Sequence, residues 1–167
     1  AIGFLKWAGA SLIIATEIRE SRARMAKRFG ADHVFDPNEK DLEKMVKEMT
    51  DGCGVDQLFE CSGVPAVFHS ATFFIRPGGQ MIQIGAIEDE VTIRPHFFFQ
   101  LKALSFFSTW GFTMNDFAIV ADCLKNEVAP FRELITSKIK TSEIIEKGFN
   151  KLLQPDHNEI KILVSPE

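Results

Sequence analysis

Short apolar runs alternate with stretches of helical periodicity along most of this sequence. The apolar runs cover residues 12–16, 33–35, 55–61, 80–85 and 104–108. Most are apolar at consecutive positions, which is typical of strands covered by helices on both faces, whereas a strand with one solvated face alternates. Strands that alternate with helices indicate βαβ units, so we expect an α/β fold with a doubly wound parallel sheet.

Helices are predicted between and after these runs. An apolar stripe at helical spacing is formed by Leu42, Met45, Val46 and Met49. Further helices are expected over 20–29 and 64–75, and "RPGG" (76–79) is expected to form a turn into the next strand. Later stripes are formed by Phe117, Val120, Ala121 and Leu124, and by Ile145, Phe149 and Leu152. Strands become sparse after Trp110, until a final strand at 160–164, so we predict a sheet domain over 1–110 and a C-terminal helix and strand segment over 111–167.

Composition and charge exclude several classes of partner. The chain has 167 residues and a net charge of −4 without a basic stripe, which argues against a nucleic-acid or membrane-surface partner. No signal peptide and no run of eighteen apolar residues is found, so a cytoplasmic location is expected. The three cysteines and four histidines are scattered, and we expect neither a disulfide framework nor a metal site built from them.

Glu17 is the first candidate site residue, because it directly follows the apolar run 12–16. Ligands of open parallel sheets bind beyond the carboxyl ends of the strands. A carboxylate there can accept hydrogen bonds from both hydroxyls of an adenosine ribose and repels a 2′-phosphate, which favours NAD over NADP. The alternative is that Glu17 only stabilises the start of the following helix.

Four segments resemble the C-terminal part of a zinc-dependent medium-chain alcohol dehydrogenase, nearest to the sorbitol, threonine and butanediol dehydrogenase group. These segments are "GADHVFDP" (30–37), "DGCGVDQLFECSGVP" (51–65), "RPGGQMIQIGA" (76–86) and "ITSKIKTSEIIEKGFNKL" (135–152). The resemblance covers essentially the whole chain and implies a Rossmann-type fold. It also implies that the first strand is missing from this chain and that the C-terminal segment returns to an absent catalytic domain. "AIG" (1–3) would be the end of a glycine-rich turn, and residues are expected to be missing between Leu5 and Lys6.

The resemblance implies a set of cofactor-binding residues. These are Ile2 and Gly3 at the pyrophosphate turn, Glu17 and Arg22 at the adenosine ribose, Cys61 and Ser62 beside the adenine-side crevice, Ile84, Gly85 and Ala86 along the nicotinamide, Ser108 and Thr109 near its carboxamide, and Lys161 near the phosphates. For several of these residues an ordinary structural role is the alternative. Ile84 and Ala86 fit the core at a strand end, Cys61 fits a small apolar position, and Lys161 fits an exposed edge charge, which we favour slightly.

The expected function follows from the same resemblance. The chain would be the NAD-binding part of an oxidoreductase that transfers hydride between NAD and a secondary alcohol or polyol, with zinc bound in the absent N-terminal domain. Since zinc polarises the substrate oxygen, this chain alone is expected to be inactive. The sequence contains no tyrosine, so the Tyr-x-x-x-Lys pair of short-chain dehydrogenases is absent. Two alternatives stay open at this point: an S-adenosylmethionine methyltransferase-like domain, and a non-catalytic nucleotide-binding or dimerisation module.

The sixteen phenylalanines bear on assembly. "HFFFQ" (96–100) and "LSFFS" (104–108) lie near the last strand of the predicted sheet, and buried packing is the default role for such residues. In the resembled family these sheet edges pair across a two-fold axis. We therefore expect a homodimer or homotetramer through the sheet edge, with an alcohol as the small-molecule partner.

Overall fold

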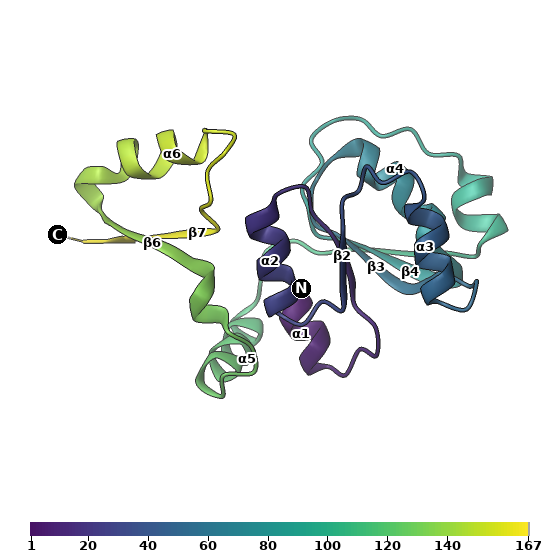
Figure 1. Cartoon of the computed structure of the whole chain (residues 1–167), viewed down its shortest axis with the longest axis horizontal. Helices are drawn as coiled ribbons and strands as arrows, with labels where there is room; N and C mark the ends of the chain where they lie inside the picture. The colour runs from purple at the N-terminus through teal and green to yellow at the C-terminus, as the bar shows by residue number, and fades with distance from the viewer. Residues whose placement is uncertain (167) are drawn as a thin grey trace. The chain divides into compact units, whose positions relative to one another are not determined.

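The computed structural model describes residues 1–166 and shows an α/β chain (Figure 1). The strands are β1 (Ile14–Thr16), β2 (His33–Phe35), β3 (Val55–Glu60), β4 (Ile75–Gln83), β5 (Ser105–Ser108), β6 (Ile135–Lys140) and β7 (Lys161–Ser165). The α-helices are α1 (Ile2–Trp7), α2 (Glu20–Arg28), α3 (Leu42–Met49), α4 (Pro65–Phe74), α5 (Met114–Lys125) and α6 (Asn150–Leu152). Two π-helices (His96–Leu101, Ile144–Phe149) and two 3₁₀ helices (Phe131–Leu134, Thr141–Glu143) complete the described elements.

The chain divides into two compact units. One contains Ala1–Pro37 and the C-terminal residues from Met114 onward, and the other contains Asn38–Thr113. The division near residue 113 lies close to the boundary expected at 110. This division groups the first 37 residues with the C-terminal segment, and the domain boundary expected at 110 stays a prediction.

Every strand pair in the described residues is parallel, as the sequence predicts. β1 pairs with β2, β3 and β5 both pair with β4, and β6 pairs with β7. Parallel strands need crossover connections, and α2 and α4 supply them between β1 and β2 and between β3 and β4. The fold class is therefore confirmed as α/β with parallel strands, while the missing first strand stays a prediction.

The start of β4 differs from the sequence-based expectation. "RPGG" is predicted as a turn, but β4 begins at Ile75, directly after α4. The strand absorbs these residues as an irregularity, because Val55 pairs with Ile75 and the next partners are Gln57 and Gln80. Gly78 has a φ of +72°, which glycine adopts readily.

The core of the Asn38–Thr113 unit lies between α4 and β4. Ala71, Ile75 and Met81 are at most 2% exposed, and Val55, Leu58, Phe68 and Leu104 pack against them. The stripe predicted on α3 is buried at Leu42 and Val46. β5 is exposed at all four positions, so the expectation of strands covered on both faces is wrong for β5.

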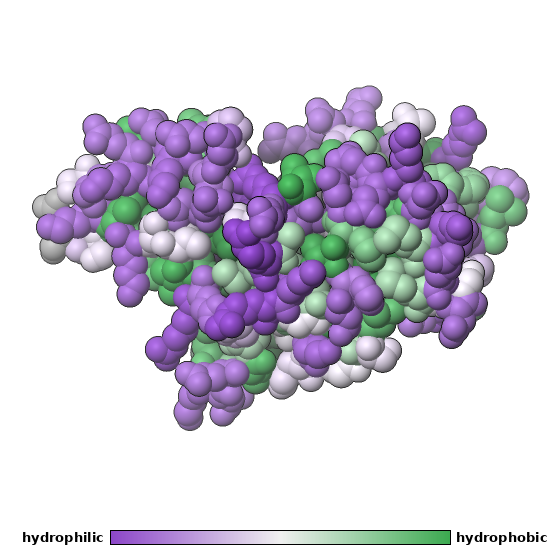
Figure 2. Space-filling model, in the orientation of Figure 1, coloured by the Kyte–Doolittle hydropathy of each residue, from purple (hydrophilic) through white to green (hydrophobic). Residues whose placement is uncertain are grey.

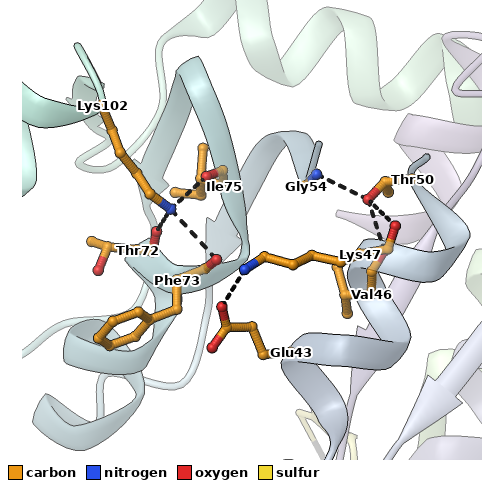
Figure 3. Close-up of polar contacts among 9 residues, drawn as sticks. All are labelled: Glu43, Val46, Lys47, Thr50, Gly54, Thr72, Phe73, Ile75 and Lys102. Atoms are coloured by element: carbon orange, nitrogen blue, oxygen red, sulfur yellow. Dashed lines mark hydrogen bonds and ion pairs between the residues drawn. The ribbon is translucent and has the colours of Figure 1, made fainter. Parts of the chain in front are cut away.

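Lys102 stabilises the junction between α4 and β4 (Figure 3). Its ammonium donates hydrogen bonds to the carbonyls of Thr72 (2.7 Å), Ile75 (2.9 Å) and, more weakly, Phe73 (3.5 Å). The last carbonyls of a helix lack partners within that helix, and no turn follows α4 to supply them. Desolvation by burial lowers the pKa of the Lys102 ammonium.

Many large apolar side chains are exposed, notably on α5. Phe117, Val120 and Leu124 of its predicted stripe are 60%, 41% and 41% exposed, and Cys123 is the buried residue of this helix. Figure 2 shows hydrophobic residues interspersed with hydrophilic ones on the face that it draws. Within the described residues, no helix is both long enough and apolar enough to span a bilayer.

Candidate functional site

A buried carboxylate organises the carboxyl ends of β3 and β4. Glu60 is the last residue of β3 and is 1% exposed. Its Oε1 accepts hydrogen bonds from the backbone N–H (2.8 Å) and hydroxyl of Ser62. The N–H of Gly63 points at both carboxylate oxygens, at 3.2 and 3.1 Å. Gln83, at the end of β4, donates from Nε2 to Glu60 Oε2 (2.6 Å) and to the Gly85 carbonyl (2.6 Å).

Glycine allows the two loops that follow β3 and β4 to touch through their backbones. A Cβ at Gly63, where φ is +70°, would lie 2.3 Å from the carbonyl oxygen of Ala86. A Cβ at Gly85 would lie 2.3 Å from the nitrogen of Gly63 and 2.9 Å from Glu60 Oε2. Side chains at either position would separate the loops, so glycine is required there. The Glu60 carbonyl joins them further by accepting from the N–H groups of Ile84 (2.8 Å) and Gly85 (2.9 Å).

The carboxyl end of β5 lies beside the same loops. Ser108 pairs with Gln83 across the sheet, and the Thr109 N–H donates to the Gln83 carbonyl (3.1 Å). The structure thus brings together seven of the predicted site residues at one edge of the sheet: Cys61, Ser62, Ile84, Gly85, Ala86, Ser108 and Thr109. Ile84 is 45% exposed and Cys61 and Ala86 are exposed as well, so these three residues are not core positions.

Glu17 lies at the carboxyl end of β1, as predicted. Its N–H continues the ladder to Phe35 (3.0 Å), and its Oε1 accepts from the N–H of Arg19, the N-cap residue of α2 (2.9 Å). One carboxylate oxygen therefore stabilises the helix start, as the structural alternative held. Oε2 has no hydrogen-bond partner in the part of the chain that the structure describes, so it can accept from a ligand.

The remaining predicted residues of this unit take part in packing and chain pairing. Gly3 is buried in α1, and a Cβ there would lie 2.9 Å from Ala129 and 3.1 Å from Phe29. Ile2 precedes it in α1. These contacts show that Gly3 permits close packing of α1. The predicted role of Ile2 and Gly3 at the cofactor pyrophosphate stays a prediction.

The contacts of Arg22 and Lys161 in the described residues are with groups other than the Glu17 carboxylate. Arg22 donates from Nη2 to the Glu159 carbonyl at 3.5 Å, a weak contact. Lys161 begins β7, pairs with Ile135 and is exposed. The edge-charge alternative for Lys161 matches this exposure, and a role at the cofactor phosphates stays a prediction.

Glu60 and Gln83 are the site residues that sequence reasoning missed. The available signal was the one used for Glu17, an acidic residue at the end of an apolar strand. Glu60 was hidden because the predicted strand ran through it to Cys61. No group of three or more metal-ligating side chains occurs in residues 1–166.

Comparison with known proteins identifies the relatives of this chain. The model of the zinc-binding dehydrogenase family matches residues 1–126. The (R,R)-butanediol dehydrogenase of Neisseria gonorrhoeae is 29% identical over 155 residues, which cover 92% of this chain and 43% of that protein. The crystal structure of 2R,3R-butanediol dehydrogenase from Bacillus subtilis has a TM-score of 0.87 and 31% identity, covering 99% of this chain and 47% of that chain.

A structure of more distant sequence shares the fold. An Escherichia coli CFT073 protein, described as a short chain alcohol dehydrogenase complexed with cofactor NADH, has a TM-score of 0.84 at 20% identity, over 98% of this chain and 48% of that chain. This chain thus spans less than half the length of the relatives it matches. The family resemblance read from the sequence is confirmed: the chain belongs to the zinc-binding dehydrogenase family, the medium-chain alcohol dehydrogenases.

Proposed function

We propose that this chain is the NAD-binding part of a dehydrogenase that transfers hydride between NAD and a secondary alcohol or polyol. The observation that carries the proposal is the carboxylate of Glu17 at the carboxyl end of β1, with Oε2 available to a ligand. A carboxylate at this point of a parallel sheet suits the ribose hydroxyls of NAD and repels the additional phosphate of NADP. The family match removes the support for the methyltransferase alternative.

Each of the two units, taken by itself, holds residues suited to part of a dinucleotide. Glu17 supplies an acceptor for the adenosine ribose, and the loops after β3 and β4 present half-buried backbone at Gly63 and Gly85 beside exposed Ala86. Exposed Ile84 offers an apolar surface to the nicotinamide. In this proposal the residues of the chain bind and orient the cofactor.

The zinc belongs elsewhere in the proposal. Bound zinc polarises the substrate oxygen as a Lewis acid. The described residues contain no cluster of side chains that fits a zinc ion. The chain by itself is proposed to bind NAD without turning over an alcohol.

Calorimetry with NADH, NADPH and S-adenosylmethionine tests this proposal. We expect heat from NADH alone. Replacement Glu17→Ala is expected to raise the Kd for NADH by about tenfold or more, since hydrogen bonds to a charged acceptor contribute about 1.5–3 kcal/mol. The matched control is Glu20→Ala, which removes an exposed acid three positions later on α2. Silence toward all three ligands would leave a non-catalytic module, and equal Kd values for Glu17→Ala and wild type would remove the assigned role.

We also propose that two copies pair through β5. This strand ends the order β3-β4-β5, so its outer backbone groups have no neighbour in that sheet. Phe106 packs against Phe68 with ring centroids 5.9 Å apart, while Phe107 is 51% exposed. Light scattering is expected to show a dimer, and Phe107→Asp is expected to give a monomer. A wild-type monomer at micromolar concentration would contradict the pairing.

A further inference from the structure

The Glu60 carboxylate is buried without a cation. None of the ion pairs among residues 1–166 involves Glu60. Its partners are neutral groups of Ser62, Gly63 and Gln83. Neutral donors stabilise the oxygens locally but do not cancel the net charge, so a buried negative charge lies at this edge of the sheet.

The hydrogen bonds around Glu60 suit an ionised carboxylate. The N–H of Ser62, the N–H of Gly63 and the Nε2 group of Gln83 can only donate. The Ser62 hydroxyl accepts from the Val64 N–H (3.2 Å) and donates its own hydrogen to Glu60. A protonated carboxyl could donate only to the second lone pair of the Ser62 hydroxyl, whereas the three N–H donors and the Ser62 O–H together suit an ionised carboxylate.

The carboxylate also lies directly behind the loop assigned to the nicotinamide. A Cβ on Gly85 would come within 2.9 Å of Glu60 Oε2, and Gln83 Nε2 bridges that oxygen and the Gly85 carbonyl. Gly85 has no side chain to separate the carboxylate from a ring on the open side of the loop. The electrostatic interaction between the Glu60 carboxylate and the ring would therefore act over a short distance through the protein interior, where charges are screened less than in water.

We infer that Glu60 favours the oxidised cofactor, NAD⁺, over NADH by placing an uncompensated negative charge behind the nicotinamide loop. This inference rests on the proposed NAD binding. The two cofactor forms differ in net charge by one positive charge, which is on the nicotinamide ring of NAD⁺ and absent from NADH. The rest of the dinucleotide is the same, so a buried anion near the ring acts on the ratio of the two affinities. Glu60 touches no substrate in this account and is a positioning and specificity-determining residue.

The ratio Kd(NADH)/Kd(NAD⁺), measured by calorimetry on the full chain, is the test. Replacement Glu60→Gln keeps the side-chain shape and removes the charge. We expect the ratio to fall on the order of tenfold, because the lost attraction between the carboxylate and the positive nicotinamide ring is only partly screened at this separation. Glu60→Asp keeps the charge and shortens the side chain; it is expected to weaken both cofactors and to leave the ratio within about twofold. A purely structural role for Glu60 would change both affinities together.

A second variant guards against misfolding of Glu60→Gln. Replacement Gln83→Lys keeps Glu60 and supplies a cation where the Gln83 amide now donates, 2.6 Å from Oε2. The ratio is expected to fall as in Glu60→Gln, whereas Gln83→Met, which adds no charge, leaves it unchanged. Binding of neither cofactor by the wild type would overturn the proposed function and this inference with it. Binding of both cofactors with an unchanged ratio in Glu60→Gln or Gln83→Lys would overturn the inference alone.

Discussion

Helices α3 and α5 carry the same kind of apolar stripe and treat it in opposite ways. On α3, Leu42 and Val46 are each 4% exposed, whereas on α5 Phe117 is 60% and Leu124 41% exposed. The spacing of apolar residues sets which face of a helix is apolar. The spacing does not determine what packs against that face. Of these two helices, α3 has its apolar face covered and α5 has most of its apolar stripe exposed.

Truncation of one leucine on each helix gives the largest expected contrast. Leu42→Ala is expected to lower the free energy of unfolding by about 2–4 kcal/mol, because the cavity forms in a packed site. Leu124→Ala is the matched control and is expected to cost less than about 1 kcal/mol, since its side chain already contacts water. Urea unfolding followed by circular dichroism measures both, and equal losses would contradict the comparison.

A buried carboxylate links β6 to the segment before β7. Glu159 is 5% exposed and binds Lys151, Thr136 and Ser137. The Lys151 ammonium, followed by the Thr136 hydroxyl, lowers the pKa of Glu159 from 4.5 to about 2.

This lowered pKa predicts acid sensitivity. The stabilisation is complete above the unfolded-state pKa of 4.5 and is lost as the pH falls toward about 2. It amounts to about 1–3 kcal/mol. Thermal unfolding across this range checks it, with Glu159→Gln as the comparison. The variant is expected to lose this part of the acid sensitivity, and an unchanged pH profile would contradict the assignment.

Loss of the Lys102 contacts is expected to have a smaller effect. Lys102→Met keeps much of the side-chain length but leaves the carbonyls at the end of α4 without their donor, and we expect a loss of about 1–2 kcal/mol. Lys44→Met is the control, because Lys44 is 74% exposed and lies 3.8 Å from Glu48. The same urea titration should show a clear loss for Lys102→Met only.

The smallest effect is expected at the surface of α3. Lys47 and Glu43 form an ion pair of 2.6 Å one helical turn apart (Figure 3). Such pairs contribute about 0.3–0.5 kcal/mol and weaken with salt. Glu43→Gln should therefore shift the unfolding midpoint only slightly at low salt and less at high salt. A loss comparable with that of Leu42→Ala would show that the apolar stripe is not what holds α3.

The sequence predicts the order of elements well, because periodicity and apolar runs are local signals. β2 is found at its predicted bounds and α2 ends one residue earlier than predicted. The start of β4 escaped prediction, since "RPGG" has turn chemistry and its strand pairing depends on a partner twenty residues away. The exposure of β5 and α5 also depends on tertiary packing, which periodicity does not encode.

The candidate site was predicted in part for the same reason. Residues after the ends of β3, β4 and β5 gather at one edge, because parallel strands present their carboxyl ends together. Residue spacing could not predict that one carboxylate oxygen of Glu17 accepts from the Arg19 N–H while the other is left for a ligand. Nor could the link between Glu60 and Gln83, which requires the register of β3 against β4.

The contact between Gly63 and Ala86 has a mechanical consequence. Because the two backbones approach closely without side chains between them, we expect the two loops to move together more readily than apart. A nicotinamide ring that binds at this edge would contact a surface already formed in the free protein. Little conformational entropy of these loops would then be lost on binding.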